Sequence, residues 1–133
     1  IVMLTDNQGT NYQISDAATV EALLHAGAVF NAIVVGRAKR PGEAQLFKNS
    51  DFTPADVFTL AEQTGGEVLP ARNAGETFAQ MLERLRSRYS LHIRPADAEN
   101  GTYRRIRVDL SPEARKRYPK AEIRSREGYT VTD

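Results

Sequence analysis

The first eleven residues constrain the fold of this chain more than any other stretch. The apolar residues Ile1 to Leu4 run directly into Thr5 and Asp6, and a polar loop containing Gly9 follows. An unbroken apolar run this short predicts a strand that is buried on both faces inside a parallel sheet. Open α/β sheets bind ligands beyond the carboxyl ends of their strands, so Thr5, Asp6 and Asn7 are candidate ligand-binding residues.

Residues 12–88 alternate between helical and strand patterns, as is typical of a parallel α/β sheet. Apolar residues recur at helical spacing behind good capping residues, and apolar runs of strand length separate these segments. We predict a helix capped by Ser15, a strand over 28–36, a helix capped by Thr53 with Pro54 at its first position, a strand over 67–70 and a helix capped by Asn73. Phe78 and Met81 belong to the apolar stripe of the last helix and are predicted core residues.

A long irregular connection covers residues 37–52. Connections of this length often carry function, and this one leaves from the same edge of the sheet as Asp6. Arg37, at its start, is therefore a further candidate ligand-binding residue. The alternative is a surface insertion without a binding role.

From Tyr89 onwards the apolar period changes to two, which predicts strands over 89–94, 102–110 and 121–126. Short connections between them predict a small antiparallel sheet. We therefore predict an α/β fold: a partial doubly wound, Rossmann-like sheet of three parallel strands with helices, followed by an antiparallel β extension. The predicted division is residues 1–88 for the α/β part and 89–133 for the extension packed on it.

Composition narrows the functions that fit the chain. None of the 133 residues is cysteine, which excludes disulfides and thiolate metal sites. There is no apolar run of about 20 residues, so we expect no membrane insertion. There is also no phosphate-binding loop, dinucleotide fingerprint or nucleophile elbow, and we therefore predict a protein that is not an enzyme, with no catalytic residue.

The extension carries an excess of basic residues, although the net charge of the whole chain is only +1. These arginines could form a polyanion site, or they could line a solvated strand face on which Asp109 and Glu122 pair with them across strands. We favour the solvated face and expect no nucleic-acid partner. The arginines are Arg94, Arg105, Arg107, Arg124 and Arg126.

The order of these segments resembles the second half of a von Willebrand factor type A domain. The resemblance rests on the apolar strand ending in Thr5-Asp6 and on the helix that ends Leu60-Ala-Glu-Gln-Thr-Gly-Gly66. The stretches 89–93, 101–108 and 123–129 are similar to the extension of the VWFA-related proteins of acidobacteria. The resemblance covers nearly the whole chain.

The family implies a metal-ion-dependent adhesion site at the carboxyl edge of the sheet. Its ligands are an Asp-x-Ser-x-Ser loop, a threonine and an aspartate from three different loops. Only the aspartate has a counterpart here, Asp6, and Asn7 stands where the family usually has glycine. Since Mg²⁺ requires about six oxygen ligands, we expect a partial site of low occupancy and no cofactor in this chain, with Mg²⁺ or Mn²⁺ possible in the complete domain.

The leading functional hypothesis is a non-catalytic binding module of the adhesion type, with an incomplete metal site and a protein or extracellular ligand. The alternative is a structural fragment that associates with itself through residues 1–5, because a strand without its neighbour leaves an edge that seeks a partner. A phosphoryl-transfer or hydrolytic enzyme that uses Asp6 is less favoured. The resemblance alone suggests an extracytoplasmic location.

Overall fold

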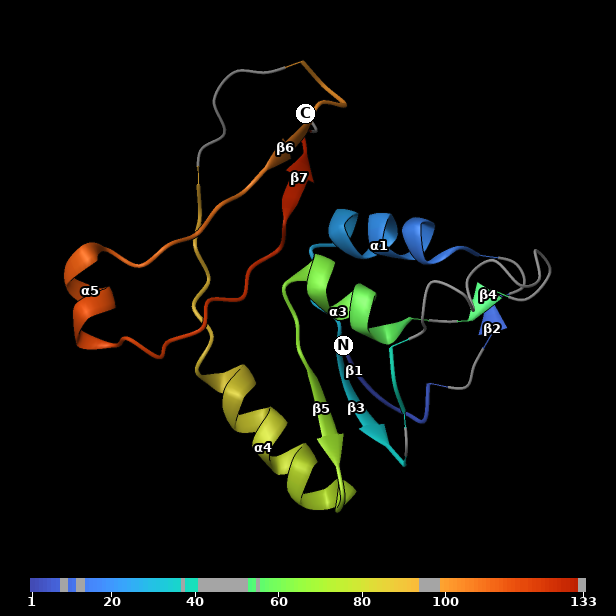
Figure 1. The fold of residues 1–133 in the computed structure, drawn as a ribbon. Helices are drawn as coiled ribbons and strands as arrows, with labels where there is room; N and C mark the ends of the chain where they lie inside the picture. Colours follow the sequence, from blue (N-terminus) through green and yellow to red (C-terminus); the bar gives the residue numbers. More distant parts are fainter. Residues whose placement is uncertain are drawn as a thin grey trace.

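A three-stranded parallel sheet forms the centre of the computed structural model, which describes residues 1–7, 10–11, 14–36, 38–40, 53–54, 56–93 and 99–131. The order is β1-β3-β5, so β3 is the central strand (Figure 1). The strands are β1 (Val2–Thr5), β3 (Asn31–Val35) and β5 (Val68–Ala71). Helices and parallel strands thus give the α/β fold that the sequence predicts.

Helices α1 (Asp16–His25) and α3 (Val57–Thr64) cover one face of this sheet. Their apolar side chains form one cluster with Ala32 and Val34, which project from β3 to this face. The predicted cap at Ser15 is confirmed, since its side chain accepts a hydrogen bond from the Ala18 amide at 3.2 Å. The other members of the buried cluster are Val20, Phe30, Val57, Leu60 and Ala61.

Helix α4 (Ala74–Arg86) packs on the opposite face, against β3 and β5 (Figure 1). Its predicted cap is confirmed, because the Asn73 side chain accepts from the Gly75 amide at 3.1 Å. Met81 is fully buried, as predicted. The prediction for Phe78 is wrong: 47% of Phe78 is exposed, because the helix turns only a narrow stripe toward the two strands that it covers.

The predicted start of the second helix is also wrong. Asp56, not Thr53, is the cap of α3, and its carboxylate accepts from the amides of Phe58 at 3.0 Å and Thr59 at 3.2 Å. Thr53–Pro54 instead form β4, which pairs with β2 (Thr10–Asn11) in a two-stranded antiparallel sheet. Aspartate and threonine are both favourable cap residues, so residue type does not decide between them, and the pairing of Thr53–Pro54 with β2 excludes these residues from the helix.

The described residues of the extension contain two paired strands rather than three. Strand β6 (Tyr103–Arg105) pairs antiparallel with β7 (Gly128–Thr130), and α5 (Pro112–Arg117) lies between them. Residues 89–93 and 121–126 contain no strand, which corrects two of the predicted strands. The segment that pairs with residues 102–110 lies nearer the C-terminus than the predicted strand over 121–126. The Ile106 amide donates to the Glu127 carbonyl at 2.7 Å.

The extension contacts the α/β part at the loop between α3 and β5. The Glu127 amide donates to the Gln63 carbonyl at 3.4 Å, and Arg124 of the extension pairs with Glu67 at 2.6 Å. Gly65 has a φ of +76°, and a Cβ there would collide with the backbone of Ser125 and Arg126. Within the described part of the chain, no helix is long and apolar enough to cross a membrane.

Candidate functional site

The outer edge of β1 is the main candidate binding surface. The Asn31 amide donates to the Ile1 carbonyl at 3.0 Å, and Met3 pairs in register with Ala32. Backbone N–H and C=O groups alternate in direction from one residue of a strand to the next. The groups that point toward β3 are therefore those of Ile1, Met3 and Thr5. The N–H and C=O groups of Val2 and Leu4 therefore point outward, and no described strand pairs with them.

The side chains of β1 are not buried on both faces, which corrects the prediction from the apolar run. Met3 is 43% exposed and Leu4 is 59% exposed. They lie on opposite faces of the strand. An apolar run of this kind indicates a central strand, but among the described strands β1 is at the edge of the sheet and only β3 has a strand on each side.

Thr5 and Asn7 stabilise the turn that follows β1. The Thr5 hydroxyl accepts a hydrogen bond from the Asn7 amide at 3.0 Å. The buried Asn7 side chain donates to the Lys39 carbonyl at 3.0 Å and accepts from the Val57 amide at 3.4 Å. Asn7 thus joins the end of β1 to the connection after β3 and to the start of α3, and these contacts occupy its amide group.

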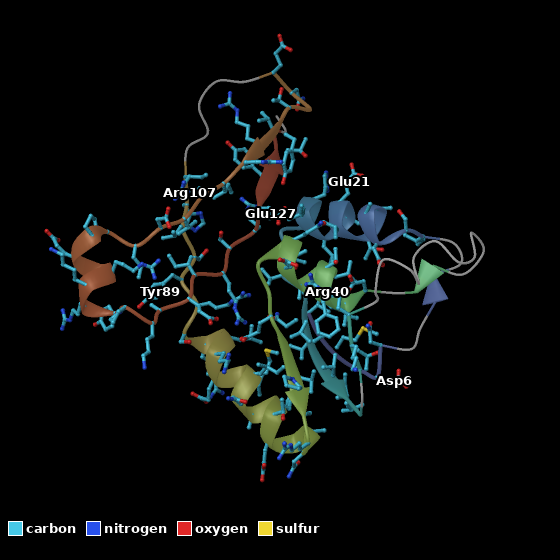
Figure 2. All side chains as sticks on the ribbon, viewed as in Figure 1. Asp6, Glu21, Arg40, Tyr89, Arg107 and Glu127 are labelled. Carbon is cyan, nitrogen blue, oxygen red and sulfur yellow. The ribbon has the colours of Figure 1, made fainter. Side chains whose placement is uncertain are left out.

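Asp6 is exposed at the carboxyl end of β1, at the margin of the sheet (Figure 2). The described residues contain no group of three or more His, Cys, Asp or Glu side chains that could hold a metal ion. The side-chain amide of Asn7 is already bonded to the backbone of Lys39 and Val57, so its oxygen is not available to a metal ion. The described neighbours of Asp6 therefore do not fit a complete octahedral Mg²⁺ site. Arg37, the fourth candidate, lies outside the described residues.

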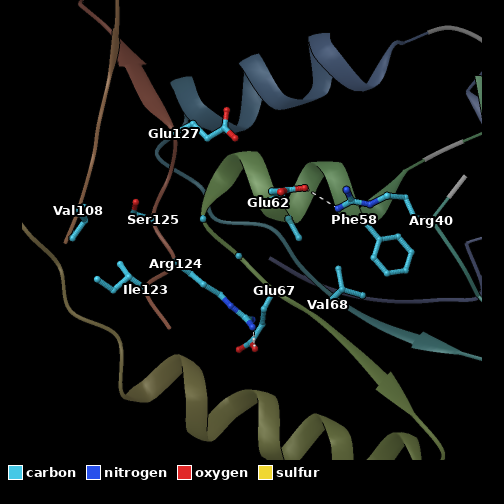
Figure 3. A pocket seen from close by; sticks show the side chains of 13 residues that line it. Arg40, Phe58, Glu62, Glu67, Val68, Val108, Ile123, Arg124, Ser125 and Glu127 are labelled. Carbon is cyan, nitrogen blue, oxygen red and sulfur yellow. Dashed lines mark hydrogen bonds and ion pairs between the residues drawn. The ribbon is translucent and has the colours of Figure 1, made fainter. Parts of the chain in front are cut away.

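A cleft of about 510 Å³ lies between the α/β part and the extension (Figure 3). On one side, the guanidinium of Arg40 pairs with Glu62 at 2.7 Å and lies 5.9 Å from the Phe58 ring centre. On the other side, Arg124 bonds to Glu67 at 2.6 Å. The two cations that line this cleft, Arg40 and Arg124, are already paired with carboxylates, so the cleft offers no unpaired cation to an anionic ligand.

Two of the basic residues of the extension also pair locally. Arg107 bonds to Asp109 at 2.7 Å, and Arg124 bonds to Glu122 at 3.0 Å. Both pairs join residues two apart on the same segment, which corrects the predicted pairing across strands. Arg94 lies outside the described residues.

Sequence reasoning missed two features of the surface. Glu67 pairs with Arg84 at 2.7 Å as well as with Arg124. Both partners are distant in sequence, so no pattern in the residues around Glu67 predicts these ion pairs. Phe78 and Leu82 form an exposed apolar stripe on α4. The width of the apolar face of α4, wider than two strands can cover, could have indicated this stripe.

Comparison of the chain with protein-family models, curated proteins and solved structures found no match.

Proposed function

We propose that this chain is a non-catalytic binding module of the adhesion type, which takes its protein ligand at the outer edge of β1. The observation that carries the proposal is the combination of outward backbone groups at Val2 and Leu4 with exposed apolar side chains at Met3 and Leu4. Such an edge is a template for strand addition: the backbone supplies affinity, and alternate side chains supply selectivity.

Asp6 enters this proposal as the single carboxylate of an incomplete metal site next to the binding edge. Its exposure at the carboxyl end of β1 supports a contact with a ligand that crosses this edge. Mg²⁺ or Mn²⁺ binding would require further oxygen ligands beyond those that the described residues bring to Asp6. An extracellular ligand and an extracytoplasmic location remain part of the proposal through the family resemblance.

Self-association through residues 1–5 is the second candidate, favoured by the same exposed edge. An edge strand that is apolar on both faces is also a template for a further copy of itself. The chain would then have a structural role without a ligand of its own.

A short strand-forming probe tests the proposed binding edge. The probe is a soluble peptide of alternating threonine and valine, titrated into ¹⁵N-labelled protein. We expect the amide signals of Val2 and Leu4 to shift, because their N–H groups point outward. The substitution Val2→Pro should abolish the shift of the Leu4 amide, since it removes one outward N–H group without removing a bond to β3. Shifts confined to the cleft beside Arg40, or no shifts, would contradict the proposal.

A further inference from the structure

We propose that the strand which β1 accepts is β1 of a second copy of this chain, paired antiparallel about a two-fold axis through Met3. The exposed stripe of α4 formed by Phe78 and Leu82 flanks the seam. This inference rests on the proposed binding edge and develops the second candidate function, self-association, by naming the register in which two copies pair. The result would be a continuous six-stranded sheet with a symmetric interface.

The backbone directions fix the register of this pairing. Val2 and Leu4 carry the outward N–H and C=O groups, whereas those of Met3 point toward β3. In an antiparallel pair, Val2 therefore faces Leu4 of the partner subunit, and Leu4 faces the partner's Val2. All outward donors and acceptors of the two strands are satisfied. Met3 faces the partner's Met3 as a pair without backbone bonds, which is the close type of pair.

Self-complementarity is the reason to prefer a second copy over a foreign strand. The same two residues supply both the donors and the acceptors, at the spacing that two-fold symmetry requires. Residues 1–5 carry no charged side chain, so bringing two copies together creates no repulsion between side chains along the seam.

The register of the parallel sheet shows which side chains meet at the seam. Leu4 pairs with Ile33, so both project to the face that α4 covers, whereas Met3 projects to the face of α1 and α3. On α4, Phe78 and Leu82 lie about 100° around the helix from the buried residues Thr77 and Met81.

The opposite flank of α4 lies beside β5, because Arg84 on that flank reaches Glu67. Phe78 and Leu82 therefore face the β1 side of the sheet. A two-fold axis perpendicular to the sheet keeps both copies of α4 on one face. The two apolar stripes would then border the strip formed by Leu4 and the partner's Leu4.

The apolar area is near the lower limit for a specific interface. Met3, Leu4, Phe78 and Leu82 are 43%, 59%, 47% and 36% exposed. For residues of about 200 Å² each, this gives roughly 370 Å² per chain and about 740 Å² for the pair. The backbone edges bring the total toward the ~1,000 Å² that specific interfaces bury, so we expect a dimer with a dissociation constant on the order of micromolar.

Because the chain has no cysteine, a single introduced cysteine reports the register directly. Residues in a pair of the close type have Cα atoms about 4.5 Å apart, which suits a disulfide. We expect Met3→Cys to form a covalent dimer under mild oxidation, at a rate at least tenfold above that of Leu91→Cys. Leu91 is the matched control, since it is 72% exposed and lies outside the proposed interface. Equal rates for the two variants would overturn the proposal.

Sedimentation equilibrium on the unmodified chain gives a second, independent measurement. We expect a monomer–dimer equilibrium that Leu4→Lys weakens at least tenfold and that Leu91→Lys leaves unchanged. Circular dichroism would verify that both variants are folded, as expected for exposed positions. A wild-type monomer at 200 μM would overturn the second-copy proposal. If the strand peptide still shifted the Val2 and Leu4 amides of that monomer, only the identity of the partner would fail, whereas absence of both effects would refute the binding edge itself.

Discussion

Oε2 of Glu67 lies 2.6 Å from Nη1 of Arg124, although 57 positions separate the two residues. The same oxygen lies 2.7 Å from Nη1 of Arg84 on α4. The Glu67 side chain is only 10% exposed, whereas both arginines are half exposed. One carboxylate thus fastens both α4 and the extension to the start of β5, and it does so with charge-assisted bonds of short length.

Replacing Glu67 with Gln should loosen both attachments. The substitution keeps the shape of the side chain but removes the charge that two guanidinium groups share. Because the arginines are partly solvated, we expect a loss of about 1–2 kcal/mol in the free energy of unfolding rather than the larger loss of a fully buried pair. Hydrogen exchange should also accelerate over residues 121–127. Urea denaturation and exchange mass spectrometry measure the two effects.

Glu83→Gln is the matched control for Glu67→Gln. Glu83 pairs with Arg86 at 2.8 Å, but both side chains are more than two-thirds exposed. Exposed pairs of this spacing contribute little, so we expect a change within about 0.5 kcal/mol. Equal effects of the two substitutions would mean that Glu67 has no special role in holding the extension.

Asn7 should be required for its backbone conformation as well as for its side chain. Its φ of +54° lies in the left-handed region, which asparagine tolerates better than most residues. Asn7→Gly removes the bonds to Lys39 and Val57 but fits this φ, whereas Asn7→Ala removes the bonds and adds strain. We expect the order of stability to be wild type, then Gly, then Ala, with Ala lower than Gly by about 1 kcal/mol. Thermal unfolding of the three proteins measures the order, and an alanine variant as stable as the glycine variant would contradict it.

Gly66 should not tolerate any side chain. A Cβ at this position would overlap the Phe30 carbonyl oxygen, a backbone atom of the residue that precedes β3. We expect Gly66→Ala to cost about 3 kcal/mol or more, since the backbone must move to accept it. Gly75→Ala is the control: its Cβ would meet nothing closer than 3.6 Å, and in the first turn of α4 it should be neutral or stabilising by up to about 1 kcal/mol. Denaturation of both variants decides the matter.

Metal titration should distinguish a complete site from an incomplete one. For residues 1–133 we expect only weak Mn²⁺ binding by calorimetry, weakened further in Asp6→Asn, because the described residues around Asp6 do not supply a full set of oxygen ligands. Tight binding by residues 1–133 that Asp6→Asn abolishes would show that this chain holds a complete metal site at Asp6.

The features that sequence predicts correctly here depend on nearby residues. Ser15 and Asn73 cap helices because their side chains reach amides two or three positions ahead, and the apolar period of α4 places Met81 in the core. Local patterns of this kind were enough to predict three parallel strands and their helices.

The remaining features depend on which distant segments meet. The composition of residues 1–4 is the same whether β1 is central or at an edge, and only the strand order shows that it is at the edge. Alternation over 89–94 and 121–126 is compatible with strands, yet β6 pairs with Gly128–Thr130 instead. Within the site, the contacts of Asn7 with Lys39 and Val57 span 32 and 50 positions, so no local pattern reports them.

Met81 and Phe78 provide a final test, because they share one apolar pattern but differ in burial. Met81 is fully buried on the face of α4 that packs on the sheet. Met81→Ala should lower the free energy of unfolding by about 2–4 kcal/mol, through the lost burial of apolar atoms and the cavity that remains. Phe78 is half exposed in a single chain, so Phe78→Ala should cost about 1 kcal/mol when unfolding is measured at submicromolar protein, where dimers dissociate. At higher protein concentration, the gap between the two variants should narrow, because Phe78→Ala would then also lose contacts at the seam. A gap that does not change with concentration would place Phe78 outside any interface.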